Sequence, residues 1–351
     1  MSIKTISLSG TPEEIGFQHG ELLSDQIHRN IDFYKSIFLN NFGDQSQILR
    51  AAQHFKERIQ VYNPNFVTEI DHIALGAGVS EPLWVYGINS RTELSMMTKA
   101  QECTAIVCPK KRLIGQTWDW AQKLEGNFVV MKISFPNGHK ILQLCEAGII
   151  GKIGLNDHGL GVTLNYLFCE GTEPSTTPIH IVLRQILESR TLEAAKNAVR
   201  KSGSGKASNI IIAQLDKAVD IEFAGNIMEF YEIDDEEIYV HTNHYLHTKA
   251  PILADEESLL NSNTRFNTAM KSLENHSACD SRKMIEVLSD QSNGTNAILA
   301  KYKPDAQGML GYYGTLATII MDLQKRTMLV RKGNPSNRSF SMDAFDEYHC
   351  D

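Results

Sequence analysis

Cys103 and Asp119 are the two residues whose types and spacing point most directly to chemistry. Cys103 stands where a helical first part of the chain gives way to strand patterns, and it precedes the run Thr-Ala-Ile-Val-Cys at 104–108. Asp119 follows one predicted hairpin later, in Gly-Gln-Thr-Trp-Asp-Trp at 115–120. A hairpin of this length would bring the carboxylate back to the thiol. Taken alone, however, a cysteine is usually a small buried apolar residue, and an aspartate at a strand end suits a turn.

Three histidines, His241, His244 and His247, offer a second kind of chemistry. If their segment is extended, the first and third point to one face and the second to the other, which does not favour a metal site. His244 could instead pair with Cys103 in a hydrolase of the papain type, which would need no cleavage of the chain. The Ser-Gly-Ser-Gly-Lys run at 202–206 lacks the spacing of a phosphate-binding loop, so it predicts a helix-to-strand connection.

The elements that must position these residues change in type near residue 103. Before it, an opening strand is followed by helical patterns, the first of which starts with the capping box Thr-Pro-Glu-Glu at 11–14. After it come strands separated by glycine-containing turns. This order lacks regular βαβ alternation and predicts antiparallel sheets flanked by helices, an α/β layered sandwich. Helices are expected over 12–38, 46–62 (capped by Ser46), 66–75, 82–97, 179–202 (in two pieces, the second capped by Thr191), 262–273 and 281–288, and strands over 104–108, 113–120, 128–135, 141–144, 149–153, 160–167, 209–215, 218–223, 227–232, 237–241, 314–322 and 327–332.

Composition narrows the class of protein. An apolar content of 42% and a charged content of 22% are ordinary for a soluble globular chain. The net charge of −8 and the scattered basic residues argue against a nucleic-acid partner. No apolar run approaches the roughly 20 residues that span a bilayer, so no membrane partner is expected. The start of the chain does not resemble a secretory signal, and six widely spread cysteines suit reduced thiols, so a cytoplasmic location is expected.

Several short motifs resemble one enzyme family in the same order along the chain. Glu-Cys-Thr-Ala at 102–105, followed by Gly-Gln-Thr-Trp-Asp-Trp, is similar to the start of the β chain in the isopenicillin N acyltransferase family of N-terminal-nucleophile hydrolases. Choloylglycine hydrolases and penicillin V acylases are more distantly similar. Further matching segments lie at 73–80, 89–93, 159–165, 242–245, 315–322 and 333–335, so the resemblance covers almost the whole chain.

The resemblance implies a fold and a mechanism. The fold would be an αββα four-layer sandwich, with two antiparallel sheets between helix layers. The chain would cut itself between Glu102 and Cys103, giving a helical α chain, 1–102, that stays associated with a β chain, 103–351. Cys103 would then form an acyl-thioester and pass the acyl group to an amine or to water, without a cofactor or metal. The implied partner is a small N-acyl amide or acyl-CoA thioester, and a homo-oligomer is compatible with this scheme.

The resemblance also implies roles for four residues beside the nucleophile. Asp119 would hold the new α-amine, Asn165 and Asn243 would orient the amine and stabilise the oxyanion, and Arg265 would polarise the surroundings of the thiol. Without the family, the two asparagines would equally suit turns and the arginine a helix surface. One departure is Gln116, where the choloylglycine hydrolase and penicillin V acylase relatives have an arginine.

Further points about the site and the function follow from the sequence. The charge lost at Gln116 could be absent, or Arg91 or Arg265 could replace it. Arg91 and Glu93 are also expected to form a salt bridge within a helix. Penicillin acyltransferases have a glycine before the nucleophile, so the bulkier Glu102 could slow the cut. A catalytically silent binding protein on the same fold is the alternative from a different functional class.

Overall fold

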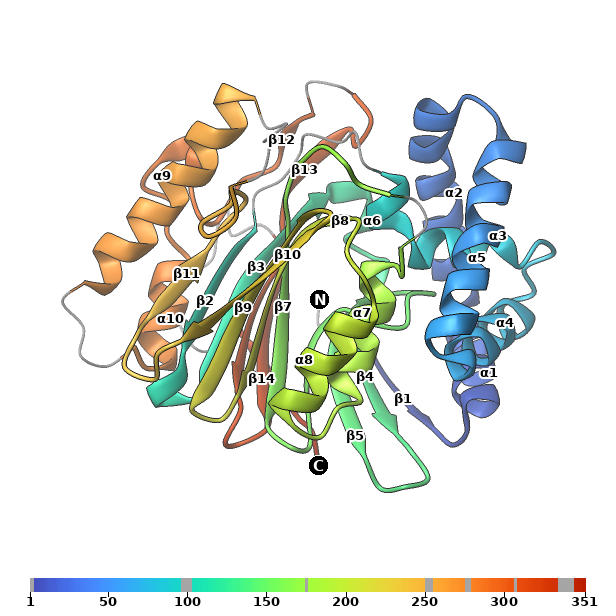
Figure 1. Ribbon diagram of the computed structural model, residues 1–351, viewed down its shortest axis with the longest axis horizontal. Helices are drawn as coiled ribbons and strands as arrows, with labels where there is room; N and C mark the ends of the chain where they lie inside the picture. The colour runs from blue at the N-terminus through green and yellow to red at the C-terminus, as the bar shows by residue number, and fades with distance from the viewer. Residues whose placement is uncertain are drawn as a thin grey trace.

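Two stacked β-sheets with helices on both outer faces form the body of the molecule (Figure 1). The computed structural model describes residues 3–95, 103–173, 176–249, 255–274, 279–305, 308–333 and 344–351. The four layers confirm the predicted α/β sandwich. Among the helices in these ranges, none combines the length and the apolar character needed to cross a bilayer.

The larger sheet contains eight strands in the order β1-β4-β5-β6-β7-β8-β9-β10. All neighbouring strands in it run antiparallel except β1 and β4, which pair in parallel. The prediction of two purely antiparallel sheets is therefore wrong at this edge. The whole N-terminal helical part separates the two strands, so no hairpin forces them to run in opposite directions. The strands are β1 (Thr5–Ser9), β4 (Phe128–Ser134), β5 (Lys140–Glu146), β6 (Ile153–Asn156), β7 (Leu160–Tyr166), β8 (Lys206–Gln214), β9 (Lys217–Gly225) and β10 (Ile227–Ile233).

The smaller sheet carries Cys103 at the start of one of its central strands. Its order is β11-β2-β3-β13-β14-β15, with β12 paired to β13. Every residue of β2 and β3 is buried, because the larger sheet covers one face and two helices cover the other. The strands are β2 (Thr104–Cys108), β3 (Leu113–Ala121), β11 (Tyr239–His241), β12 (Lys303–Pro304), β13 (Tyr312–Asp322), β14 (Thr327–Lys332) and β15 (Asp346–His349), and the covering helices are α9 (Glu256–Leu273) and α10 (Ser281–Leu288).

Six N-terminal helices pack beside the larger sheet, and two further helices cover its outer face (Figure 1). Close contact between the first and fourth helices depends on glycine: a Cβ atom at Gly20 would lie 2.3 Å from the Ile73 carbonyl oxygen. The predicted caps at Thr11 and Thr191 are confirmed, but Asp44 rather than Ser46 caps α3. The helices are α1 (Pro12–Leu22), α2 (Ser24–Phe42), α3 (Gln45–Tyr62), α4 (Pro64–Ala77), α5 (Leu83–Asn89), α6 (Arg91–Leu94), α7 (Ile179–Leu187) and α8 (Leu192–Lys201).

The strand predicted over 149–153 begins only at Ile153. Gly148 has a φ of +87°, which turns the chain away from a strand. The side chain of Asn89 then takes the place of a neighbouring strand, donating to the Gly148 carbonyl at 2.8 Å and accepting from the Ile150 amide at 3.0 Å. The short strand β6 therefore starts directly after Lys152.

The helix predicted over 82–97 is not continuous. Within its described residues it is divided at Ser90 into the short helices α5 and α6.

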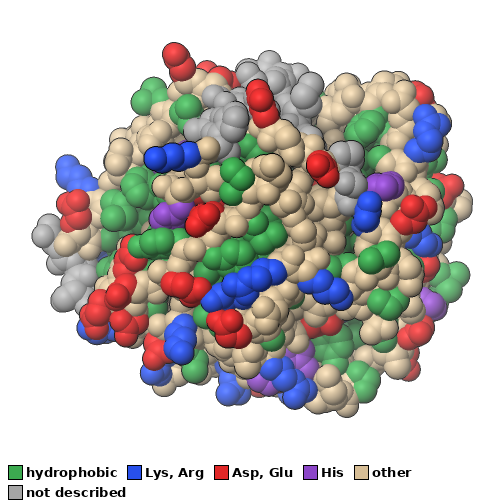
Figure 2. Space-filling model, viewed as in Figure 1, with side chains coloured by type: hydrophobic (Ala, Val, Ile, Leu, Met, Phe, Trp, Pro, Cys, Tyr) green, Lys and Arg blue, Asp and Glu red, His purple; other side chains and the backbone are tan. Residues whose placement is uncertain are grey.

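Charged side chains of both signs are interspersed on the molecular face shown in Figure 2. Lysine and arginine side chains alternate there with aspartate and glutamate rather than forming one basic patch. A surface of this kind gives a polyanion no continuous site to follow. The expected absence of a nucleic-acid partner remains a prediction.

Candidate active site

Cys103 faces a cavity between the two sheets and the N-terminal helices. The cavity has a volume of about 50 Å³, and Cys103 itself is 8% exposed. Asp119 and Asn243 line it together with the thiol, so the structure brings three of the predicted site residues together. The remaining polar lining residues are Arg91, Thr92, Ser95 and Lys152, and the apolar ones are Trp118, Trp120, Ile153, Leu164 and Tyr166.

The hairpin of β2 and β3 places Asp119 beside Cys103, as the sequence predicted. Thr104 lies opposite Thr117 in the register, and the Thr104 amide donates to the Thr117 hydroxyl at 3.1 Å. The chain before β2 therefore passes Trp118 and Asp119. The Asp119 backbone N–H donates to the Cys103 sulfur. A rigid hairpin thus fixes the carboxylate-bearing residue against the thiol.

Burial keeps the Cys103 thiol in its protonated form. Burial and the nearby Asp119 carboxylate raise its pKa to about 12. The Asp119 backbone N–H and the cations Arg265 and Lys152 oppose this rise. A thiol with such a pKa is almost wholly protonated at neutral pH, although the thiolate is the reactive form. Catalysis at Cys103 therefore requires a base.

Arg265 joins the start of β2 to the Asn243 loop from beneath the site. It is completely buried, and its guanidinium donates to the Cys103 carbonyl at 2.7 Å and to the Asn243 side-chain oxygen at 2.8 Å. The same group donates to the Thr104 hydroxyl at 3.1 Å and to Asn261 at 2.8 Å. The planar fork of arginine suits several acceptors at once, which a lysine cannot match. Arg265 therefore positions Cys103 and Asn243 relative to each other.

We expect Arg265→Lys to lower the free energy of unfolding by about 2–4 kcal/mol, because buried acceptors lose their charged donor. Urea unfolding at neutral pH measures this change. Arg50→Lys, at a surface site on α3 where the guanidinium donates to Ser46, is the control and should stay within about 0.5 kcal/mol of the parent protein. A fully stable Arg265→Lys protein would contradict the positioning role.

The loop after β11 is held by a buried carboxylate, Glu222. This side chain accepts from the backbone amides of Leu246, His247 and Thr248 and pairs with His241 at 3.0 Å. Such a cradle leaves the loop little freedom. The loop carries Asn243, whose side-chain nitrogen donates to the Tyr166 carbonyl at 2.9 Å. Asn243 is therefore fixed at the cavity wall.

The side chain of Asn165 is directed at the loop after β11. Its side-chain nitrogen donates to the carbonyls of His241 and Thr242, both at 2.9 Å, and the residue does not line the cavity. Both of its amide hydrogens are thus directed at the Asn243 loop rather than at Cys103. In this geometry Asn165 supports the loop, and a role in stabilising an oxyanion remains a prediction.

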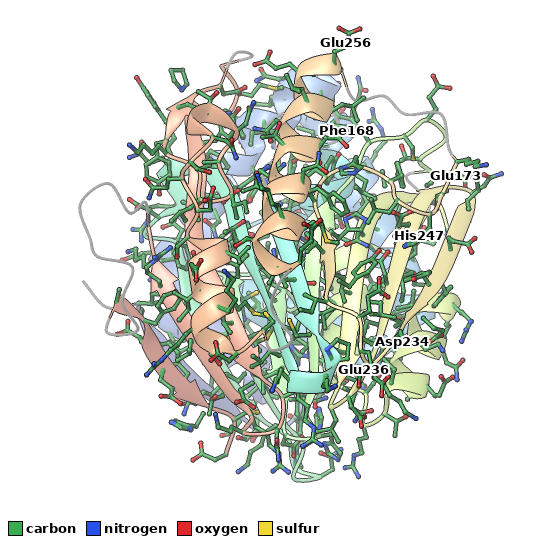
Figure 3. The ribbon with its side chains drawn as sticks, turned by 90° about the vertical axis from the view of Figure 1, so that its left-hand side faces the viewer. Phe168, Glu173, Asp234, Glu236, His247 and Glu256 are labelled. Atoms are coloured by element: carbon green, nitrogen blue, oxygen red, sulfur yellow. The ribbon has the colours of Figure 1, made fainter. Side chains whose placement is uncertain are left out.

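The side chains of the three histidines after β10 point to different neighbours. His247, labelled in Figure 3, lies over the yellow strands of the larger sheet, and its ring stacks on Tyr231 at 4.0 Å between centroids. His244 points to the Ser262 hydroxyl at 2.8 Å, and burial lowers its pKa to about 4. It is absent from the cavity lining, which disfavours a Cys–His dyad. His241 could share a cation with Asp220 and Glu222, but hydrogen bonds already engage all three.

Lys152 and its carboxylate partner, Glu146, were missed by sequence reasoning. Lys152 lines the cavity, donates to Glu146 and lies 3.6 Å above the centroid of the Trp118 ring. Arg91 binds the same carboxylate at 2.8 Å, so the predicted Arg91–Glu93 salt bridge is wrong. Glu93 instead accepts from the Ile179 amide at 2.7 Å and caps α7. The three charged residues lie on separate elements, and Arg91 is 55 residues from Glu146 in the sequence, so no local pattern signals such a cluster.

Gln116, which stands where the distant relatives have an arginine, hydrogen-bonds to a neighbouring strand. Its side chain accepts from the Leu164 amide at 2.8 Å and donates to the Leu164 carbonyl at 3.2 Å, which ties β3 to β7. The cations that act on the Cys103 thiol are Arg265 and Lys152. The sequence suggested Arg91 or Arg265 as a replacement for the charge missing at Gln116. Arg265 is the one that acts on the thiol, whereas Arg91 binds Glu146.

Cys103 lies at the start of an inner strand of the αββα sandwich, the arrangement that the sequence resemblance to N-terminal-nucleophile hydrolases implied. The sequence family described as acyl-coenzyme A:6-aminopenicillanic acid acyl-transferase matches residues 107–337. The chain is also 30% identical over 343 residues to the 40 kDa form of acyl-coenzyme A:6-aminopenicillanic-acid-acyltransferase from Emericella nidulans, covering 95% of this chain and 93% of that relative. This chain belongs to that family, which supports acyl transfer or amide hydrolysis as its activity.

Two solved structures are also similar to the chain. Penicillin V acylase from Agrobacterium tumefaciens has a TM-score of 0.40 and 11% identity, over 70% of this chain and 90% of that one. A variant of conjugated bile acid hydrolase from Clostridium perfringens has a TM-score of 0.45 and 13% identity, over 70% of this chain and 92% of that one.

Proposed function

We propose that this protein is a self-processing cysteine acyltransferase or linear-amide hydrolase with Cys103 as its nucleophile. The observation that carries the proposal is the position of Cys103: it directly precedes a buried central strand, at a cavity that Asp119 and Asn243 also line. An enzyme of the acyltransferase or acylase kind is what the family supports. Cleavage before Cys103 would place a free α-amine at the same cavity.

The first step we propose is cleavage of the Glu102–Cys103 bond. Glu102 lies outside the described residues, so the step rests on Cys103 and on the family. The Cys103 thiol adds to the Glu102 carbonyl, and its proton goes to the departing Cys103 amine. Water then opens the thioester, leaving the Glu102 carboxylate and the free Cys103 thiol. The resulting chains, 1–102 and 103–351, would stay together through the buried contacts between their layers.

The new α-amine supplies the base that the uncut chain lacks. Its reference pKa is about 7.7–8.0, close to neutral pH, so it can take the thiol proton without help from a histidine. The Asp119 carboxylate would hold the amine by a charge-assisted hydrogen bond. The thiolate attacks an acyl donor, and the protonated amine returns the proton to the leaving group. Water or an acceptor amine then releases the acyl group from the thioester.

The cavity wall favours a donor with an apolar acyl group. Its apolar walls are formed by two tryptophans, Ile153, Leu164 and Tyr166. A small N-acyl amide or an acyl-CoA thioester could present such a group to Cys103, and the choice between hydrolysis and transfer depends on which acceptor reaches the thioester. A panel of N-acyl amides and acyl-CoA thioesters, with acyl-enzyme formation followed by intact-mass measurement, separates these donors.

The test of self-processing is a denaturing gel of the purified protein. From the mass of 39.3 kDa, we expect two bands at roughly 11 and 28 kDa in proportion to chain length. Cys103→Ala should remain a single full-length chain and form no acyl-enzyme. Cys108→Ala, which removes another buried thiol of the same strand, is the matched control and should be cut normally.

Two outcomes would overturn parts of the proposal separately. A wild-type protein that is active as one uncut chain would exclude self-processing and favour the unprocessed Cys–His mechanism. A processed protein that gains no acyl mass on Cys103 with any donor of the panel would favour the catalytically silent binding protein. If the chain does process itself, some residual precursor is expected, because Glu102 is bulkier than the glycine of the penicillin acyltransferases.

A further inference from the structure

A second cluster of chemically active side chains lies at two turns of the larger sheet. His139 ends the turn between β4 and β5, and Asp157 and His158 belong to the turn between β6 and β7. His139 is 3% exposed, and one ligand atom from each residue lies within 4.8 Å of the other two. None of the three lines the Cys103 cavity, and the proposed function makes no use of them. The β4–β5 turn closes at the lower end of the sheet in Figure 1.

The hydrogen bonds of His139 determine which of its ring nitrogens carries a proton. Nε2 lies 2.9 Å from the Leu187 carbonyl oxygen, which can only accept, so Nε2 must be the donor. In the neutral ring, Nδ1 is then left with a lone pair. That buried atom has no hydrogen-bond partner among the described residues, although Asp157 Oδ1 lies 2.9 Å away. Two lone pairs therefore face each other, an arrangement that a bound cation would stabilise.

A metal ion fits this contact better than a proton does. The N–H of a protonated Nδ1 would not be aligned with Asp157 Oδ1, and a poorly aligned hydrogen bond is weak. An ion bound by both atoms instead lies to one side of the line that joins them. With zinc–ligand distances of about 2.0–2.2 Å, tetrahedral ligand atoms lie roughly 3.3–3.6 Å apart. Asp157 Oδ1 lies 2.9 Å from His139 Nδ1 and 2.7 Å from His158 Nδ1, so these separations need to widen by less than about 1 Å.

The surrounding hydrogen bonds hold the three side chains as a metal site requires. Histidine ligands normally donate their other ring N–H to a carbonyl or a carboxylate, and His139 does so at Leu187. Asn156, which is fully buried, donates to the same carbonyl at 2.9 Å and accepts from the His158 amide at 3.0 Å. The ring of His139 and the turn that carries Asp157 and His158 thus share one anchor at the end of α7.

We propose that His139, Asp157 and His158 bind a Zn²⁺ ion through the two Nδ1 atoms and a carboxylate oxygen. Imidazole nitrogens with one carboxylate suit zinc, whereas Mg²⁺ and Ca²⁺ prefer oxygen ligands. His158 then carries its ring proton on Nε2. The side chains of Asp157 and His158 are 20% and 32% exposed, so the ion can enter from solvent and a water can complete its tetrahedron. By joining two turns of the larger sheet, the ion would stabilise the fold without taking part in catalysis.

Zinc titration of the full chain, purified without a histidine tag and freed of metal by EDTA and dialysis, tests the proposal. The Cys103→Ala chain is used, so that the catalytic thiol cannot bind zinc. Calorimetry with zinc chloride should show one ion per chain, and magnesium chloride should show none. Asp157→Asn and His158→Gln should each weaken zinc binding by about 100-fold or more, because losing even an outer hydrogen-bond partner of a metal ligand costs about 10- to 100-fold.

His54→Gln is the matched control. His54 is a half-exposed histidine on α3 that lies 4.0 Å from the carboxylate of Glu57, and its removal should leave the zinc affinity unchanged. An ion that binds only the folded state also stabilises that state. Zinc should therefore raise the midpoint of thermal unfolding of the wild-type protein and of His54→Gln, but not of Asp157→Asn or His158→Gln.

Two results would overturn the inference. One is the absence of zinc binding in the Cys103→Ala chain, and the other is unchanged zinc affinity in Asp157→Asn and His158→Gln. If one of these two variants does not fold, the other decides, because each removes a separate ligand. Failure of the proposed function would appear separately, as uncut wild-type protein or as an absence of acyl mass on Cys103.

Discussion

Asp119→Asn should reduce kcat/KM for acyl-enzyme formation by about 100- to 1,000-fold, the size of effect seen when one preorganised electrostatic partner is removed from a reacting site. Asp119 is 3% exposed and lines the cavity beside Cys103. Under the proposed function its carboxylate holds the α-amine that serves as the base. An asparagine has nearly the same shape but no charge, so the amine loses its ionic partner and its fixed orientation.

The same reasoning predicts the direction in which the pH profile of kcat/KM should shift. A carboxylate beside an ammonium group favours the charged form and therefore raises the pKa of the amine. The basic form of the amine accumulates above that pKa, so activity rises as pH increases through it. Asp119→Asn should consequently move the rising limb of the kcat/KM profile to lower pH, while the maximum rate falls.

The measurement is the rate of acyl-enzyme formation across the pH range, made on the processed fraction and followed by intact mass. Asp322→Asn is the control, because that aspartate, the last residue of β13, pairs with Lys325 and does not line the cavity. It should leave both the rate and the profile unchanged. An Asp119→Asn enzyme with the parental rising limb would show that Asp119 does not hold the base.

The local part of the site was predictable from the sequence. Cys103 and Asp119 belong to one hairpin, and the length of a hairpin fixes which residues lie opposite each other. Asn243 and Arg265 depended on the family resemblance, because residues of separate elements become neighbours only through the packing of layers. Their hydrogen bond joins the loop after β11 to α9, a contact that no local pattern encodes.

Buried charges account for most of what the sequence could not predict. Arg91, Glu146 and Lys152 come from a helix, a strand and a turn, and each alone suits an exposed position. Asn165 shows the opposite case, since its motif matched the family while its amide is directed at two backbone carbonyls. The position of Lys152 depends on the turn at Gly148 and on the Asn89 side chain, both set by tertiary contacts.

Glu146→Gln should lower the free energy of unfolding by about 3–5 kcal/mol, the usual consequence of removing one partner from a buried ion cluster. The neutral side chain leaves Arg91 and Lys152 as two buried cations with no carboxylate between them. Arg91 and Lys152 lower the pKa of Glu146 to about 2 against the opposing effect of burial. Its contribution to stability is therefore complete above its ordinary pKa of 4.5 and is lost as pH falls through about 2. The difference between the variant and the parent protein should shrink in the same acidic range.

Urea unfolding at neutral pH and near pH 3 measures this difference, with Glu193→Gln as the exposed control that should change stability by less than about 0.5 kcal/mol. Adding Lys152→Met to Glu146→Gln removes one of the two stranded cations, so the double variant should recover part of the lost stability. Such a recovery requires that the two residues interact, because independent sites give additive losses. A double variant that is less stable by the sum of both single losses would contradict a carboxylate shared by Arg91 and Lys152.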